Sequence, residues 1–176
     1  MLIFEIILIV FIITAGISIV LTSMKTGISP SPSSGKTYRA IATATEHAGA
    51  GPIVDLGSGW GTLVVALAGK YPHRQVVGYE LSFVPWLFSS IRKSVSGLDN
   101  LTLYRRDFLK ADLSDASVFT CYLFPNGMVS LKDKLEQDNI HDVLIVSSTF
   151  ALPSSEPLKV IRVQDMYNTP VYLYRR

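Results

Sequence analysis

The feature that most constrains this fold is a short apolar strand that runs directly into closely spaced glycines. Ile53 to Leu56 are followed by Gly57, Gly59 and Gly61, and then by a stretch with helical spacing. Because glycine has no side chain, its backbone can approach a nucleotide-containing cofactor closely at such a strand-to-helix turn. The run therefore predicts a binding site for a nucleoside-containing cofactor.

Short segments rich in β-branched and aromatic residues recur along the chain and predict seven strands. They cover residues 53–56, 75–79, 101–104, 118–123, 143–148, 158–163 and 171–174. Apolar residues with helical spacing predict helices at 36–47, 62–70, 85–96 and 129–137. Only residues 164–170 join the last two strands, which suits a hairpin. The pattern predicts an α/β, Rossmann-like, doubly wound seven-stranded sheet with a C-terminal antiparallel hairpin.

The N-terminus carries an unusually apolar segment. Residues 6–24 contain nineteen residues without a charge, and they raise the hydrophobic content to 48% and the mean hydropathy to +0.33. A helix of this length nearly spans a hydrocarbon core. We interpret residues 1–24 as one transmembrane helix that anchors the protein in a lipid bilayer. A signal peptide or a buried helix is the alternative, although Glu5 is the only charge before the apolar run.

Charge and composition after this segment predict how the rest of the chain is organised. Residues 25–36 are rich in Ser, Pro and Gly and predict a linker, followed by one domain over residues 37–176. Lys25, Lys36 and Arg39 follow the apolar run and no Lys or Arg precedes it, which predicts a domain on the cytoplasmic side. The formal charge is only +2 without a long basic run, so nucleic acid is not an expected partner.

An acidic residue closes the second predicted strand. Glu80 lies nineteen residues beyond Gly61, a separation at which a carboxylate can accept hydrogen bonds from both hydroxyls of a ribose. Ligands of doubly wound sheets bind beyond the carboxyl ends of the strands. The glycines and the acid together predict cofactor binding more strongly than either feature alone.

Two further strand ends supply candidate residues. After the third strand, Asp107 can accept a hydrogen bond from the exocyclic amine of a base while Phe108 packs on the face of that base. An N-cap or turn aspartate is the alternative explanation of Asp107. After the fourth strand, residues 122–128 lie where they would line the substrate side of the site, although their Pro-Asn-Gly sequence also suits a plain turn.

Other reactive residue types do not form a convincing site. His47, His73 and His141 are scattered without metal-ligand spacing, so we assign no metal. The single Cys121 lies in an apolar stretch and is interpreted as a core residue. Ser58 lacks the Gly-x-Ser-x-Gly pattern of a hydrolase nucleophile, which disfavours that class.

Taken in order, these motifs resemble class I S-adenosylmethionine-dependent methyltransferases, over residues from about 36 to 176. The resemblance rests on Asp55-Leu56-Gly57-Ser58-Gly59-Trp60-Gly61, Gly78-Tyr79-Glu80-Leu81, Asp107-Phe108 and Phe124-Pro125. Within this class the chain is most similar to small membrane-anchored protein-lysine methyltransferases. That group includes the mitochondrial ATP synthase c-subunit and adenine nucleotide translocase lysine methyltransferases.

The resemblance implies S-adenosyl-L-methionine as the cofactor. Gly57, Ser58, Gly59 and Gly61 would pass beneath its methionyl and ribose portions, and Asp55 would support the methionine amino group. The remaining site residues follow the order of the strands. By the same resemblance, Glu80 would hold the ribose hydroxyls, and Asp107 and Phe108 would frame the adenine. The acceptor would be contacted by Tyr122, Phe124, Pro125 and Asn126.

One motif departs from the pattern of this group. The group usually shows Gly-Ser-Gly-Asp-Gly-Arg, where this chain has Trp60 and Thr62. One acidic contact near the methionine end of the cofactor is therefore missing or supplied by another residue. We assign no catalytic base.

The resulting prediction is a membrane-anchored S-adenosylmethionine-dependent methyltransferase that acts on lysine of a membrane or membrane-associated protein. A lipid-soluble small molecule is the alternative acceptor, and a non-catalytic cofactor-binding protein is the alternative class. A nicotinamide-dependent oxidoreductase is a weaker alternative, because its Gly-x-Gly-x-x-Gly pattern requires glycine where this chain has Thr62.

Overall fold

A seven-stranded sheet forms the centre of the structure. The computed structural model describes residues 3–7, 9, 13, 16, 17, 20, 35–46 and 48–176. The strands are β1 (Ile53–Leu56), β2 (Val76–Tyr79), β3 (Leu101–Tyr104), β4 (Val118–Cys121), β5 (Leu144–Ser148), β6 (Lys159–Arg162) and β7 (Pro170–Arg175). Across the sheet they follow the order β3-β2-β1-β4-β5-β7-β6.

The first five strands run parallel, and the last two form the predicted hairpin. β1 pairs in parallel with β2 and β4, β2 with β3, and β4 with β5, whereas β7 runs antiparallel to both β5 and β6. Parallel neighbours require crossover connections, which contain α3 (Thr62–Lys70), α4 (Phe83–Ser96) and α5 (Pro125–Gln137). The strand order reverses between β1 and β4, so this type of fold places its ligand site at their carboxyl ends. The Rossmann-like sheet agrees with the prediction.

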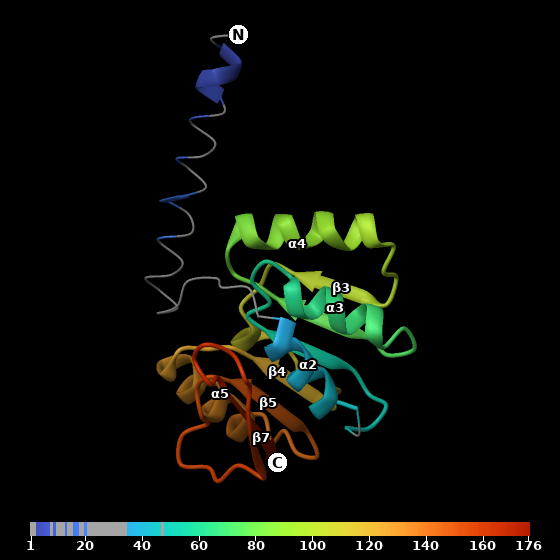
Figure 1. Cartoon of the computed structure of the whole chain (residues 1–176), viewed down its shortest axis with the longest axis vertical. Coiled ribbons are helices and arrows are strands. Elements are labelled where there is room, and N and C mark those ends of the chain that lie inside the picture. The colour runs from blue at the N-terminus through green and yellow to red at the C-terminus, as the bar shows by residue number, and fades with distance from the viewer. Residues whose placement is uncertain are drawn as a thin grey trace.

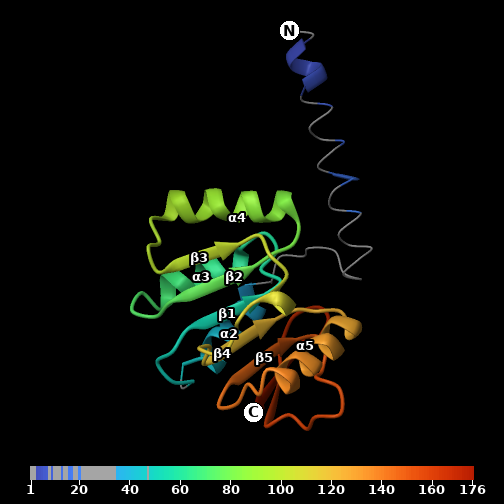
Figure 2. The same cartoon turned by 180° about the vertical axis from the view of Figure 1, so that it is seen from behind.

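Helices cover both faces of the sheet. Figure 1 shows α3 and α2 (Gly35–Ala44) in front of the sheet, and Figure 2, seen from behind, shows α5 over the opposite face. Successive residues of β1 serve the two layers: Ile53 packs in the cluster with α2 and α3, and Val54 packs in the cluster with α5. Every residue of β1 is buried, which explains why the sequence shows a continuous apolar run instead of alternation.

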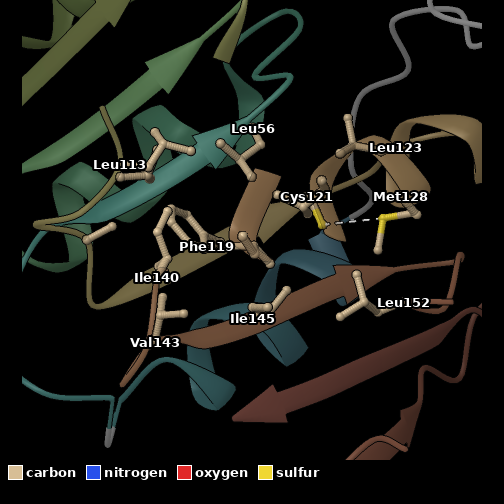
Figure 3. Close-up of a cluster of buried hydrophobic side chains, with 14 of the residues drawn as sticks. Leu56, Leu113, Phe119, Cys121, Leu123, Met128, Ile140, Val143, Ile145 and Leu152 are labelled. Atoms are coloured by element: carbon tan, nitrogen blue, oxygen red, sulfur yellow. Dashed lines mark hydrogen bonds between the residues drawn. The ribbon is translucent and has the colours of Figure 1, made fainter. Parts of the chain in front are cut away.

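The cluster beneath α5 contains the one cysteine of the chain. Figure 3 shows Cys121 pointing at Met128, and the two sulfur atoms lie 3.9 Å apart. Burial raises the pKa of the Cys121 thiol to about 12, so the side chain stays protonated in the core. The interpretation of Cys121 as a core residue is therefore confirmed.

Two helices begin earlier than the sequence pattern suggested. α5 starts at Pro125, four residues before the predicted start, and α4 starts at Phe83. Proline is well suited to the first helical position because the amide hydrogen it lacks would have no partner there. The Pro-Asn-Gly segment is therefore the first turn of α5 and does not form a plain turn.

The prediction of a transmembrane helix over residues 1–24 is wrong for the part of the chain that the structure describes. No described helix is both long and apolar enough to cross a membrane. The longest helix with described bounds, α4, has 14 residues, equivalent to about 21 Å against the roughly 30 Å of a hydrocarbon core. Most of residues 1–24, and residues 25–34 of the predicted linker, lie outside the described residues. The predicted cytoplasmic location is not tested and stays a prediction.

Candidate functional site

The glycine-rich loop after β1 is held against the end of β2. Gly57, Gly59 and Gly61 have φ angles of 83°, 52° and 75°, in the left-handed region that favours glycine. The amides of Gly57 and Ser58 both donate to the carbonyl of Tyr79, at 3.0 and 2.8 Å. These bonds bring the loop beside the carboxyl end of β2, where the sequence placed Glu80.

Glu80 is buried and is held by two backbone amides. Its Oε2 accepts from the amide of Gly59 at 2.8 Å, and its Oε1 accepts from the amide of Ser82 at 2.7 Å. Each carboxylate oxygen can accept a second hydrogen bond, so two acceptor positions remain for hydroxyl groups. The structure thus fixes Glu80 against the glycine loop and leaves acceptor capacity on both of its carboxylate oxygens.

Asp55 forms a second buried carboxyl group beside the loop. It lies across from Thr120 in the β1–β4 register, and Thr120 Oγ1 donates to Asp55 Oδ1 at 2.8 Å. Burial, partly offset by that hydrogen bond and reinforced by the charge of Glu80, raises the pKa of Asp55 to about 7. Thr120 is buried too, and its role escaped the sequence reasoning because the pairing of β1 with β4 spans 65 positions.

The charges around the loop favour a cationic ligand. Asp55 and Glu80 are both buried, yet the ion pairs found in the described part of the chain involve other carboxylates. For Asp55, burial without a cationic partner disfavours the charged form and contributes to its raised pKa. A ligand with an ammonium or sulfonium group would supply the missing positive charge, whereas the diphosphate of a dinucleotide would add further negative charge.

Ser58 provides separate evidence that a polar ligand fits the site. Its Oγ is the one buried side-chain oxygen or nitrogen of the described residues that lacks a hydrogen-bond partner. A Cβ atom on Gly78 would lie 3.0 Å from this oxygen and 2.8 Å from Leu103 Cδ2. Glycine at position 78 therefore makes room for the Ser58 hydroxyl, whose hydrogen-bonding capacity is unused in the protein alone. The buried hydroxyl and the two buried carboxyl groups fit a polar, positively charged cofactor.

The departures at Trp60 and Thr62 lie where the loop meets α4. The Trp60 ring packs edge-on against Phe88, with 5.5 Å between the ring centroids. Arg92 Nη1 reaches the Trp60 carbonyl at 3.5 Å and Thr62 Oγ1 at 3.4 Å. Both positions therefore serve contacts to α4, and these contacts supply no acidic group in place of the one that the resemblance expects.

Gly61 and Ser89 form a close approach between the loop and α4. A Cβ atom on Gly61 would lie 2.5 Å from Ser89 Cβ and 3.2 Å from Ser89 Cα. Ser89 is fully buried, and the sequence reasoning missed it. The available signal for this contact was the small residue Ser89 directly after the apolar first half of α4.

The two residues expected to frame a base after β3 lie together at the start of a short 3-10 helix, η1 (Phe108–Lys110). The Asp107 side chain caps this helix by accepting from the amide of Leu109 at 3.0 Å. Phe108 is half-buried and packs against the core cluster of α5. The geometry of Asp107 is therefore that of a helix N-cap, as the alternative explanation expected. The described residues do not test the predicted contact with adenine, which stays a prediction.

The predicted substrate-side residues lie directly after the carboxyl end of β4 and at the beginning of α5. Phe124 precedes the first turn of α5 and is 37% exposed, Pro125 and Asn126 are exposed, and Tyr122 is half-buried. Leu123, between them, reaches the glycine loop: its Cδ2 would lie 3.4 Å from a Cβ on Gly57. This segment therefore adjoins the loop that carries Ser58 and Gly59.

An aromatic residue after β5 also joins this group, and the sequence reasoning did not name it. The Phe150 ring lies 6.0 Å from that of Tyr122 and 6.1 Å from that of Phe124, measured between centroids. Its position directly beyond a predicted parallel strand was the signal that could have indicated it. The site thus spans the carboxyl ends of β1, β2, β4 and β5.

Known proteins with similar sequences are methyltransferases. A protein-lysine N-methyltransferase of Saccharolobus islandicus is 29% identical over 129 residues, which cover 69% of this chain and 77% of that enzyme. Mouse adenine nucleotide translocase lysine N-methyltransferase is 35% identical over 63% of this chain and 48% of its own length. The human lysine N-methyltransferase of the ATP synthase c-subunit is 33% identical over 61% and 46%. The chain thus spans about half the length of the two mammalian enzymes.

A solved structure shows the same fold. The RNA methyltransferase of Salinibacter ruber, in complex with S-adenosyl-L-homocysteine, superposes with a TM-score of 0.73 at 23% identity, over 82% of this chain and 92% of that one. At this identity the match concerns the fold alone and carries no information about the acceptor.

A family model identifies the class of the chain. The model of the ANTKMT methyltransferase domain matches residues 55–159, which is well over half of the 176 residues. The matched region runs from Asp55 through the glycine loop, Glu80 and the aromatic residues after β4 and β5. This chain belongs to the ANTKMT methyltransferase domain family, and its cofactor is S-adenosylmethionine, as the resemblance implied.

Proposed function

We propose that this protein transfers the methyl group of S-adenosylmethionine to lysine side chains of a protein. The observation that carries the proposal is the pair of buried carboxyl groups, Asp55 and Glu80, which converge on the glycine loop without a cationic partner in the described chain. That site accounts for a cationic nucleoside cofactor. The lysine acceptor is supported by the names of the three enzymes with similar sequences.

The residues divide the binding task. We assign the ribose hydroxyls to Glu80 and the lining of the cofactor to the glycine backbone and Ser58; the hydrogen bond that holds Glu80 to the Gly59 amide and the unpartnered Ser58 Oγ support this assignment. We assign the methionine ammonium to Asp55, whose buried carboxyl group lies at the end of β1 just before the glycine loop. When bound, the cofactor supplies a methyl group: the lysine Nε lone pair forms the new N–C bond, the C–S bond breaks, and its electron pair stays on sulfur.

The protein must align the acceptor amine with the methyl–sulfur bond of the cofactor and keep that amine neutral. A lysine amine attacks only after it has lost a proton, and an apolar surrounding lowers its pKa by disfavouring the charged form. The partly exposed rings of Tyr122, Phe124 and Phe150 provide such a surrounding next to the loop. Alignment of the two reactants then accounts for most of the remaining catalysis.

The direct test uses the whole chain with methyl-labelled S-adenosylmethionine and a cell extract divided into membrane and soluble fractions. Label recovered as methyllysine after acid hydrolysis supports the proposal, and its fraction tells whether the acceptor is a membrane protein, as the sequence predicts. Label in extractable lipid would instead favour a small-molecule acceptor. Cofactor binding by calorimetry without any transfer would indicate a non-catalytic binding protein, and Glu80→Ala serves as the inactive control.

A further inference from the structure

The outer side of α4 carries an exposed apolar stripe. Pro85 and Ser89 are the buried residues of this helix, and the helical period places a row of larger apolar residues on the side opposite to them. This row, which we call the α4 stripe, consists of Val84, Phe88, Ile91 and Val95. Its last three members are 48%, 54% and 84% exposed, in chain order.

The fold leaves the α4 stripe uncovered. Figures 1 and 2 show α4 along the outer edge of the domain. Within residues 35–46 and 48–176, α4 packs against β3 and α3 on its inner side. The solvent-facing side of a surface helix usually carries charged and polar residues, and a continuous exposed apolar surface is typical of an interaction site. The stripe therefore indicates a partner.

Trp60 extends this apolar surface beyond α4. Its ring packs edge-on against Phe88, with 5.5 Å between the centroids. Arg92, the cation next to the stripe, reaches back to the Trp60 carbonyl and to Thr62 Oγ1. The resemblance expects an acid at position 60, so the tryptophan at this position removes a charge that would border the stripe. This departure suits an apolar interface.

The spacing of the stripe is the same when it is read from either end. Its members are separated by four, three and four residues, the spacing of helices that pack side by side. Two antiparallel copies of α4 would bring Val84 opposite Val95 and Phe88 opposite Ile91. A twofold interface requires this kind of self-complementarity, because the same surface serves both subunits. The stripe therefore matches a second copy of itself.

Charges at the two ends of α4 favour the antiparallel arrangement. The Arg105 guanidinium lies 5.4 Å from the ring centroid of Phe83, the first residue of α4. Asp99 follows Gly97, which caps the other end of the helix. Both charged residues are exposed, and the ion pairs of the described residues involve neither. Antiparallel helices would bring Arg105 beside Asp99 of the second copy, whereas parallel helices would bring like charges together.

We propose that the α4 stripe is the interface for a second copy of this chain, in a dimer whose two α4 helices pack antiparallel about a twofold axis. The dimer is independent of the proposed function and adds to it. A lipid surface fits less well, because a helix that lies on a membrane carries Lys and Arg along its polar face. Here Ser94 borders the stripe on one side, and Arg92 on the other side is directed to the glycine loop.

The first test is the mass of the full chain in solution. Sedimentation velocity over a wide concentration range, in a mild detergent because of the apolar residues 6–24, should show a dimer for wild type. Ile91→Glu should raise the dimer dissociation constant at least about tenfold, because it buries an unpaired charge. The exposure of Ile91 in the single chain lets this variant fold. A monomeric wild type, or unchanged dimerisation of Ile91→Glu, would overturn the proposal.

The matched control is an exposed apolar residue at the other end of the sheet. Leu158 is 70% exposed and precedes β6, the edge strand opposite to β3. Leu158→Glu should dimerise like wild type. A loss of dimer in Leu158→Glu together with a retained dimer in Ile91→Glu would place the interface at β6 and reject the α4 stripe.

Cysteine pairs test the antiparallel geometry. A mixture of Val84→Cys and Val95→Cys chains should form disulfide-linked dimers under mild oxidation, whereas neither variant alone should form them. Identical positions of this pair lie about 16 Å apart along the antiparallel helices, too far for a disulfide. The native Cys121 is buried and does not compete. Cross-linking of each variant alone would indicate parallel or unspecific association and contradict the proposed arrangement.

A charge exchange tests the contact between the helix ends. Asp99→Arg should raise the dimer dissociation constant several-fold, because it faces Arg105 of the second copy. The double variant Asp99→Arg with Arg105→Asp restores opposite charges and should return the constant to near the wild-type value. A double variant as weak as the single one would contradict this contact.

Two further outcomes separate the alternatives. If wild type is monomeric but binds vesicles of phosphatidylcholine and phosphatidylglycerol, and Ile91→Glu does not, the stripe binds lipid and the dimer is rejected. Methyllysine formation by a monomeric wild type rejects the dimer alone. A dimer that forms no methyllysine with any protein fraction rejects the proposed function alone.

Discussion

The site has two halves that carry different kinds of side chain, one beyond β1 and β2 and the other beyond β4 and β5. Beyond β1 and β2, the site is polar and closely packed: Glu80 accepts from two backbone amides, and Gly61 leaves no room for a Cβ beside Ser89. Beyond β4 and β5, three partly exposed rings lie beside the strained backbone of Thr149, which has a φ of 71°. One half suits an invariant, charged cofactor, and the other suits a side chain that must enter and leave.

This contrast teaches how one fold can keep its cofactor and change its acceptor. The cofactor half depends on backbone amides and glycines, for which few substitutions are possible. The half that we propose for the acceptor consists of side chains that follow two strands and lie outside the sheet itself. We therefore expect substitutions in the first half to weaken or abolish cofactor binding and substitutions in the second half to alter acceptor affinity alone.

The largest effect should come from Gly61→Ala. The added Cβ would lie 2.5 Å from Ser89 Cβ, at a φ of 75°, and we expect a loss of about 3 kcal/mol in the free energy of unfolding together with loss of cofactor binding. Denaturant titration and calorimetry measure the two effects. Gly69→Ala is the matched control, because nothing lies within 4 Å of its Cβ and alanine favours a helix by about 1 kcal/mol over glycine.

Glu80→Gln should weaken cofactor binding and lower the free energy of unfolding by about 1–3 kcal/mol, because its side-chain NH2 replaces one acceptor of a backbone amide. The amide oxygen can keep one of the two backbone hydrogen bonds, but the charge that strengthens hydrogen bonds to the ribose is lost. Hydrogen bonds to charged groups contribute about 1.5–3 kcal/mol, so we expect an affinity loss of roughly tenfold to a hundredfold in calorimetry. Wild-type affinity in this variant would contradict the ribose contact.

The raised pKa of Asp55 predicts two pH dependences of opposite sign. The folded protein retains a proton on Asp55 up to about pH 7, against an ordinary pKa of 3.8. The folded state therefore binds more protons between these values, and the free energy of unfolding falls as the pH rises from about 4 to 7. Cofactor affinity should instead rise with pH through about 7, by up to about tenfold per unit, because the methionine ammonium favours the carboxylate.

Asp55→Asn tests both effects in one variant. Its stability should lack the decline between about pH 4 and 7, and its cofactor affinity should be weak and independent of pH in this range. Calorimetry in two buffers of different ionisation enthalpy measures the proton released on binding to wild type. A wild-type affinity that does not change between pH 6 and 8 would contradict contact between Asp55 and the ammonium.

The smallest effect concerns the strained residue of the acceptor half. Thr149→Asn should raise the free energy of unfolding by about 0.5–1 kcal/mol, because asparagine tolerates a positive φ better than a β-branched residue. Thermal unfolding measures this gain, and cofactor affinity should stay at the wild-type value. A loss of stability would show that the Thr149 side chain contributes packing that outweighs its backbone strain.

Much of the cofactor half was predictable, because its signals are local in the sequence. An apolar strand, three glycines and an acid at the end of the next strand constrain one another through short-range geometry. The parallel order of the strands follows from the same alternation of strands and helices. The predicted transmembrane helix shows what composition alone cannot establish, because an apolar run shows that its residues are hydrophobic but does not determine the structure they adopt.

The sequence by itself determined the sheet, the glycine loop and the position of Glu80, because backbone conformation and strand-to-helix turns depend on neighbouring residues. Only the tertiary structure decided which distant residues complete the site. Thr120 meets Asp55, Ser89 meets Gly61, and Phe150 meets Tyr122 and Phe124. These contacts depend on strand order and helix packing, which bring together residues whose spacing along the chain carries no periodic signal.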